Sequence, residues 1–283
     1  MITPHLKDDS LLADIHAVSD HSSFHFWWFG QSGFFLQWQN QHLLIDPYLS
    51  DSLTRKYANT EIPHIRMTEL AIDPARLDCI DVVTSSHNHT DHLDADTLIP
   101  LMKANPKIKL IIPEANRSFV AERLKIDSTL PIGLNDGESV EIKNFKFHGV
   151  PAAHEDIERD AQGRCKFMGY VIQFGPWTIY HSGDTVWHEE IVTQLQRFSI
   201  DVAILPINGR AAERKVVGNL NAKEAVTLAK LINARLVIPC HYDMFTFNTA
   251  DPKKFVLEAE ALGQHYRVLQ CGERFSSAEI KSI

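Results

Sequence analysis

Short apolar runs rich in aromatic and β-branched residues recur along this chain, and they constrain its fold more than any other feature. Typical examples are "FHFWWFG", "GFFLQW", "IDVVTSS", "GYVIQFG", "RLVIPCH" and "YRVLQCG", and most such runs end at Gly, Pro, Asn or Asp, as strands commonly do. In each half, the chain starts with strand patterns and then mixes strands with helices. We therefore expect a four-layer α/β protein, in which two mixed sheets pack face to face and helices flank them.

Helical patterns separate some of these runs. They occur in "DADTLIPLMKAN", "PEANRSFVAERLK", "NLNAKEAVTLAKLIN" and "DPKKFVLEAEALG". In the third segment, Asn221 is the expected N-cap, with Glu224 three residues later. In the fourth, Asp251 is the expected cap, Pro252 opens the helix and Gly263 follows its end.

The length and composition favour one folded domain. The 283 residues, of which 44% are hydrophobic, lie near the upper size for a single core. No linker or low-complexity segment interrupts them. We expect a single domain over residues 1–283, with two halves that meet near residues 135–140.

The net charge and the lack of long apolar stretches indicate which partners and compartments to expect. A formal net charge of −8 disfavours a general affinity for nucleic acid. No apolar stretch approaches the ~18 residues of a membrane span, and the N-terminus lacks a secretory signal pattern, so we expect a cytoplasmic protein. The four cysteines are widely scattered and are expected to be free thiols.

One stretch carries an unusual density of metal-ligand side chains. In "TSSHNHTDHLDADT", His87, His89, Asp91 and His92 lie within six positions, directly after an apolar run. His87 and His89 are two residues apart and can point the same way in an extended segment. Capping of the following helix would explain one Asp or Thr but not three histidines, so a metal site is the favoured interpretation.

Three single residues follow other strand patterns and are candidates for the same site. They are His154 after "FKFHGVPAA", Asp184 in "HSGDT" and His241 after "RLVIPC". Loops along one edge of a sheet commonly carry such groups. His148 is a rival to His154, but it lies inside a strand pattern, where a packed or exposed side chain is expected.

Together these motifs resemble the metallo-β-lactamase superfamily of dinuclear metal hydrolases. The resemblance rests on His87-Asn88-His89-Thr90-Asp91-His92, the later lone His, "SGDT" and "PCH", and it extends over nearly the whole chain. "WWFGQSGFF", "LLIDPYLSDS", "HSGDT" and "LPINGR" are most similar to the branch that contains L-ascorbate-6-phosphate lactonase. The implied fold is the αββα sandwich of that superfamily.

The resemblance also implies a role for each candidate. His87, His89 and His154 would bind a first metal ion, Asp91, His92 and His241 a second, and Asp184 would bridge the two. Asp46 in "LLIDPYL" and His181 would hold the ligands by hydrogen bonds from behind. The ions would be Zn²⁺ or Mn²⁺, with Fe²⁺ as a further candidate.

The implied reaction is hydrolysis by a hydroxide held between the two ions, with Asp91 and Asp184 as the catalytic carboxylates. Redox diiron members of the superfamily carry a carboxylate where His89 stands, which favours hydrolysis here. We expect a small anionic ester or lactone as substrate, and Asp91 is expected to protonate the leaving oxygen. The alternatives are phosphodiester hydrolysis on the same fold, of the phospholipase D or cyclic-nucleotide type, and a non-catalytic metal-binding protein.

Residues that would bind the substrate are less defined. Arg210 and Asn208 in "LPINGR" and the pair Arg55-Lys56 are candidates for holding an anionic group, as opposed to lying in solvated loops. The role of the basic loop 210–215, which includes Arg214 and Lys215, stays open. The lactonase resemblance further implies a homo-oligomer.

Overall fold

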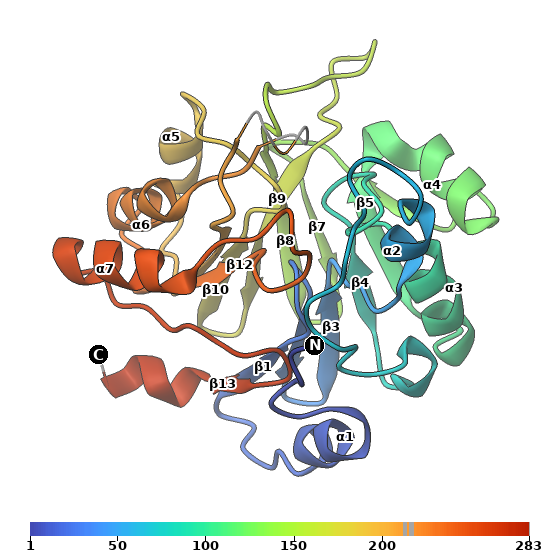
Figure 1. Cartoon of the computed structure of the whole chain (residues 1–283), viewed down its shortest axis with the longest axis horizontal. Coiled ribbons are helices and arrows are strands. Elements are labelled where there is room, and N and C mark those ends of the chain that lie inside the picture. Colours follow the sequence, from blue (N-terminus) through green and yellow to red (C-terminus); the bar gives the residue numbers. More distant parts are fainter. Residues whose placement is uncertain (212–213, 215–217, 283) are drawn as a thin grey trace.

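Two β-sheets packed face to face form the centre of the molecule, and helices lie on both outer sides (Figure 1). The structure is a computed structural model that describes residues 1–211, 214 and 218–282. The α/β class and the sandwich of two mixed sheets expected from the sequence are confirmed.

The first sheet is mixed. Its strands, in spatial order, are β13 (Arg274–Ser276), β1 (Phe24–Trp28), β2 (Phe34–Trp38), β3 (Gln41–Ile45), β4 (Val82–Thr84), β5 (Lys109–Pro113) and β6 (Ile132–Leu134). Neighbours from β13 to β3 are antiparallel, whereas β3 to β6 run parallel. The carboxyl ends of β3 and β4 therefore lie at the same edge of the sheet.

The second sheet repeats this mixture. Its strands, in spatial order, are β12 (Leu236–Cys240), β11 (Val202–Pro206), β10 (Trp177–His181), β9 (Met168–Phe174), β8 (Phe145–Pro151) and β7 (Ser139–Ile142). β10 to β12 run parallel, and β8 is antiparallel to β9, which is antiparallel to β10. As a result β8, β10 and β12 all end at one edge.

The helices connect the strands and cover the sandwich. They are α1 (Asp8–His16), α2 (Ser52–Lys56), η1 (Pro74–Arg76), α3 (Ala95–Ala104), η2 (Glu114–Asn116), α4 (Arg117–Leu124), α5 (Ile191–Leu195), α6 (Ala222–Leu231), α7 (Pro252–Leu262) and η4 (Ser277–Ser282). α3 and α4 lie beside the first sheet, and α5, α6 and α7 beside the second (Figure 1). Within the described ranges, none of the helices combines the length and apolar character needed to cross a bilayer.

The predicted helix caps are present. Asn221 accepts a hydrogen bond from the Glu224 backbone N–H, and the Glu224 carboxylate accepts one from the Asn221 backbone, which completes the capping box of α6. Asp251 caps α7, and Gly263 ends it in the left-handed conformation with φ +59°. These local signals fixed the helix ends because each satisfies backbone groups that the helix cannot pair internally.

One strand prediction was wrong. The run "YRVLQCG" forms only an isolated bridge, between Tyr266 and Val237, and the strand that pairs with β1 is β13 farther on. Leu269 and Cys271 of this run are buried in the core although the run forms no strand.

Aromatic residues of β1 fill the space between the sheets. Phe24 makes edge contacts with Phe174 and Trp177 of the second sheet, at ring-centroid distances of 5.4 and 5.2 Å. Trp27 and Trp28 are also buried. The aromatic run therefore belongs to the core, where each ring buries a large apolar area.

Gly183 joins the two sheets at the edge where β10 ends. Its φ is +59°, and a Cβ atom there would lie 2.6 Å from Ser86 Cβ and 3.0 Å from the Met168 carbonyl oxygen. The close approach lets the turn after β10 pack directly on the segment after β4.

Gly183→Ala is expected to lower the free energy of unfolding by about 2–4 kcal/mol, from left-handed strain and from overpacking against Ser86. Gly163 is the matched control, since its φ is +79° but no atom lies within 4 Å of its added Cβ. Gly163→Ala should cost only about 1 kcal/mol. Urea unfolding in the presence of a chelator measures both, and equal losses would contradict the packing argument.

Candidate metal centre

The candidate ligands come from loops at one edge of the sandwich. The β4 loop carries His87 to His92, and His154, Asp184 and His241 lie just after β8, β10 and β12. All these strands end at the same edge, so residues up to 154 positions apart in sequence meet there. The structure brings together every ligand that the superfamily resemblance implied.

Three histidines form the first group. One side-chain nitrogen each from His87, His89 and His154 lies within 4.8 Å of the others. The His154 Nδ1 atom lies 2.7 Å from the Gly218 carbonyl oxygen, so Nδ1 carries the hydrogen and Nε2 is left as an acceptor. His87 Nε2 is buried and has no hydrogen-bond partner among the residues described.

The second group contains two carboxylates. It consists of Asp91, His92, Asp184 and His241, whose candidate ligand atoms also lie within 4.8 Å of one another. Asp184 Oδ1 is 3.3 Å from His92 Nε2, while its Oδ2 is 3.4 Å from His241 Nε2 and 3.4 Å from His154 Nε2. The Asp184 carboxylate therefore lies between the two groups.

The two groups differ in their electrostatics. Burial and the neighbouring histidines lower the pKa of His87 well below its ordinary value, and burial and His154 lower the pKa of His89 to about 4. Burial also acts on His241, but Asp184 and Asp91 outweigh it and raise its pKa to about 9. The carboxylates of the second group thus attract positive charge to this position.

Asp46 supports the site from behind. Its carboxylate is fully buried, with Oδ2 2.8 Å from His92 Nδ1, and it accepts hydrogen bonds from the Thr84 hydroxyl and the Ser86 backbone. Contact through Nδ1 leaves His92 Nε2 directed into the second group. The superfamily resemblance implied such a supporting position for Asp46.

His181 lies deeper in the same edge. Its Nε2 is 2.9 Å from the Ser32 carbonyl oxygen, and its Nδ1 accepts a hydrogen bond from the Gly183 backbone. Both ring nitrogens are occupied by the backbone. His181 therefore holds the turn that presents Asp184.

Gln31 is a site residue that no sequence pattern revealed. Its side-chain Nε2 donates to Asp91 Oδ2 at 2.8 Å and lies 3.0 Å from His241 Nε2, and its backbone carbonyl accepts from the His241 N–H. Gln31 lies in "WWFGQSGFF", but no charge or ligand spacing marks it there.

Left-handed backbone conformations gather at this edge. Gln31, Asp46 and His241 have φ values of +50°, +40° and +64°. Each such residue costs about 1–3 kcal/mol and persists only where its surroundings hold it in place. Here those surroundings place Gln31 and His241 beside Asp91, and Asp46 behind His92.

The donor set fits two divalent ions. The first group offers three imidazole nitrogens, and the second offers two imidazoles and two carboxylates, a combination that suits Zn²⁺, Mn²⁺ or Fe²⁺. The buried and unpaired His87 Nε2 supports this fit, because an unsatisfied buried polar atom is costly without a partner.

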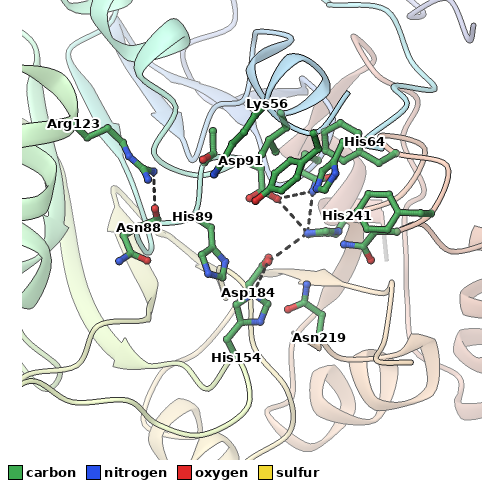
Figure 2. Close-up of a pocket in the computed structure, with 17 residues that line it drawn as sticks. Lys56, His64, Asn88, His89, Asp91, Arg123, His154, Asp184, Asn219 and His241 are labelled. Atoms are coloured by element: carbon green, nitrogen blue, oxygen red, sulfur yellow. Dashed lines mark hydrogen bonds and ion pairs between the residues drawn. The ribbon is translucent and has the colours of Figure 1, made fainter. Parts of the chain in front are cut away.

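A cavity of about 280 Å³ opens over both groups (Figure 2). His89, Asp91, His154, Asp184 and His241 form its floor. Lys56, Arg123, three asparagines and several aromatic side chains form its walls. The cavity has the volume of a small-molecule site.

The predicted substrate-binding residues are distributed unevenly. Lys56 lines the cavity, whereas Arg55 is ion-paired with Asp96 and Arg210 with Glu224, both away from it. Asn208 lies behind the wall, where it bonds the side chains of Asn219 and Asn248.

The basic loop supports the same asparagine network. Arg214 donates to the Asn208 carbonyl oxygen and to the Asn248 side chain. Lys215 lies outside the described residues. Arg123 and Asn219, which do line the cavity, were missed, since a lone Arg in a helix and a lone Asn carry no recognisable pattern.

Comparison with known proteins places this fold and site in a family. Residues 25–241 match the model of the beta-lactamase superfamily domain. A UPF0173 metal-dependent hydrolase of Opitutus terrae is 30% identical over 251 residues, which cover 87% of this chain and 96% of that protein. A counterpart in Caldivirga maquilingensis is 28% identical, over 85% of this chain and 92% of its own.

Among solved structures, a possible metal-dependent hydrolase of Veillonella parvula superposes with a TM-score of 0.71 at 21% identity, covering 89% of this chain and 98% of that one. That likeness is one of fold. The family match and the curated relatives together show that the chain belongs to the beta-lactamase superfamily, in the family of UPF0173 metal-dependent hydrolases.

Proposed function

We propose that this hydrolase opens a small anionic ester or lactone with the help of two divalent ions. The observation that carries the proposal is the position of Asp184, whose carboxylate lies between two groups of ligand-type atoms at the floor of one cavity. A carboxylate in this position could be shared by two ions.

The residues would divide as follows. His87, His89 and His154 would hold one ion, Asp91, His92 and His241 the other, and Asp184 both. Zn²⁺ and Mn²⁺ are the proposed ions, with Fe²⁺ also compatible with the donor set. When bound, such a pair lowers the pKa of a water molecule and polarises a carbonyl or phosphoryl oxygen.

The side chains around the ions have separate tasks. Asp46 and Gly218 hold the imidazoles of His92 and His154 through Nδ1, so that Nε2 of each ring is directed toward Asp184. Asp91 is the proposed proton carrier to the leaving oxygen. Its side chain is 16% exposed, compared with 3% for Asp184, so a substrate atom can reach it.

The activity test compares ester and phosphodiester chemistry. Protein reconstituted separately with Zn²⁺ and Mn²⁺ is offered plain and phosphorylated sugar lactones and an activated phosphodiester. We expect lactone opening, and a loss of more than about a hundredfold in Asp184→Asn, because a shared ligand is removed.

His148→Gln is the matched control, because His148 bonds Gln173 in the second sheet and does not line the cavity. This variant should keep wild-type turnover. Cleavage of the phosphodiester alone would move the assignment to phosphorus chemistry, and turnover retained in Asp184→Asn would refute the proposed role of the carboxylate.

Gln31 gives a second prediction, which concerns metal affinity. Gln31→Ala removes the hydrogen bond to Asp91 Oδ2, and we expect the second group to bind its ion about 10- to 100-fold more weakly. The first group should be unaffected, since Gln31 does not contact it among the described hydrogen bonds. Competition titration with a chromogenic chelator measures the two affinities, and an equal loss at both sites would indicate general damage instead.

A further inference from the structure

We infer, resting on the proposed function, that the cavity recognises two unlike parts of its substrate. Arg123 and Lys56 would bind an oxyanion group, a carboxylate or a phosphate, and the aromatic side chains of Tyr57, His64 and Phe247 would bind a flat apolar group. The substrate class is then an ester or lactone that carries both.

Arg123 is held in place by backbone carbonyl oxygens, and the nearby carboxylate of Asp94 attracts its charge without forming an ion pair with it. Its Nη1 donates to the Asn88 and Leu93 carbonyl oxygens, and the Phe119 ring lies 4.4 Å from its guanidinium carbon. Across residues 1–211, 214 and 218–282, no carboxylate forms an ion pair with it. A partly buried guanidinium with free N–H groups is a ready binding site for an oxyanion.

Lys56 is the second unpaired cation on the cavity wall. Its ammonium group lies 5.0 Å from the centre of the Tyr57 ring and makes no ion pair within the described part of the chain. The adjacent Arg55, by contrast, is paired with Asp96 outside the cavity. The difference is notable in a protein with a net charge of −8, where carboxylates are plentiful.

The carboxylates that line the cavity belong to the candidate metal site. Among its lining residues, the only ones are Asp91 and Asp184, and both belong to the second ligand group. With divalent ions bound there, they would be neutralised by the ions. Lys56 and Arg123 would then leave the walls net positive, which favours an anionic substrate.

The aromatic surface is built around His64. The His64 ring stacks on Tyr57, with centroids 4.2 Å apart and planes 15° apart, and lies 4.4 Å from the Phe247 centroid. Burial lowers the pKa of His64, which favours its neutral form. Leu53 and Phe245 are buried beneath this wall, and Tyr57 and Phe247 pack against them in one apolar cluster.

Arg123 and the aromatic side chains lie on opposite sides of the candidate metal groups, and Lys56, next to Tyr57, lies between them. In Figure 2, Arg123 and Asn88 lie beyond His89, whereas His64 lies on the side of His241, and Asp184 is between them. A substrate spanning the cavity would therefore place its central bond over Asp184. The cavity volume of about 280 Å³ suits a small molecule.

The test measures ligand binding directly. Isothermal titration of the protein as purified, with its metal content determined, gives Kd for benzylphosphonate, methylphosphonate and benzyl alcohol. We expect benzylphosphonate to bind most tightly in the wild type. Arg123→Gln and Lys56→Gln should each weaken it about tenfold or more, the effect of one charge-assisted hydrogen bond.

The controls separate recognition from folding. Lys103→Gln removes an exposed lysine of α3 that does not line the cavity, and it should leave every Kd unchanged. Lys56→Gln is less prone to disturb folding, because Lys56 is exposed and forms no described hydrogen bond. Arg123, by contrast, also supports the loop at Asn88. Phe247→Ala should reduce the advantage of benzylphosphonate over methylphosphonate.

Wild-type Kd values in both cation variants, or no binding of benzylphosphonate by the wild type, would overturn the inference. The outcome is independent of the proposed hydrolysis. If the protein hydrolyses no ester or lactone but its affinity for benzylphosphonate depends on Arg123 and Lys56, the recognition surfaces stand and the proposed function fails. Hydrolysis with no preference for anionic substrates would instead overturn the recognition surfaces and leave the hydrolytic reaction standing.

Discussion

The concentration of negative charge at one edge of the sandwich is the constraint on which the site depends. Asp46, Asp91 and Asp184 gather around His92, and Asp46 and Asp184 are nearly inaccessible to solvent. Buried carboxylates are unfavourable unless cations and hydrogen-bond donors compensate them. Without an ion, the compensation falls on the histidines, and the same carboxylates raise the pKa of His92 well above its ordinary value despite its burial. A divalent cation would take over this role and return the imidazoles to their neutral, ligating form.

The strand order creates this edge. Parallel neighbours β3 and β4 in one sheet, and β10 and β12 separated by β11 in the other, all end on the same side. The close packing of Gly183 on Ser86 then joins the two sheets where these strands end. The fold thus determines that the loops meet, and the loop sequences determine which groups are brought together.

Much of this arrangement could be predicted from the sequence. Alternating strand and helix patterns predicted the sandwich, and the dense His-Asp motif with three residues after strands predicted the superfamily, both of which are confirmed. Local sequence signals predicted helix ends well where one residue caps the helix next to it, as Asn221 does for α6 and Gly263 for α7. The specific metal roles stay a proposal that the geometry supports.

The cavity walls could not be predicted in the same way. Arg55 and Lys56 are adjacent and similar in sequence, yet Asp96 neutralises one and leaves the other facing the cavity. Arg123 and Gln31 act through contacts with loops distant in sequence, such as Asn88 and Asp91. Tertiary contacts of this kind leave no periodicity or motif in the chain.

Anomalous diffraction from crystals of the Zn²⁺-loaded protein, recorded on both sides of the zinc absorption edge, tests the proposed pair of ions most directly. We predict two zinc peaks in each chain, one against His87, His89 and His154 and the other against Asp91, His92 and His241, with Asp184 contacting both. A single peak, or peaks away from Asp184, would contradict the dinuclear site.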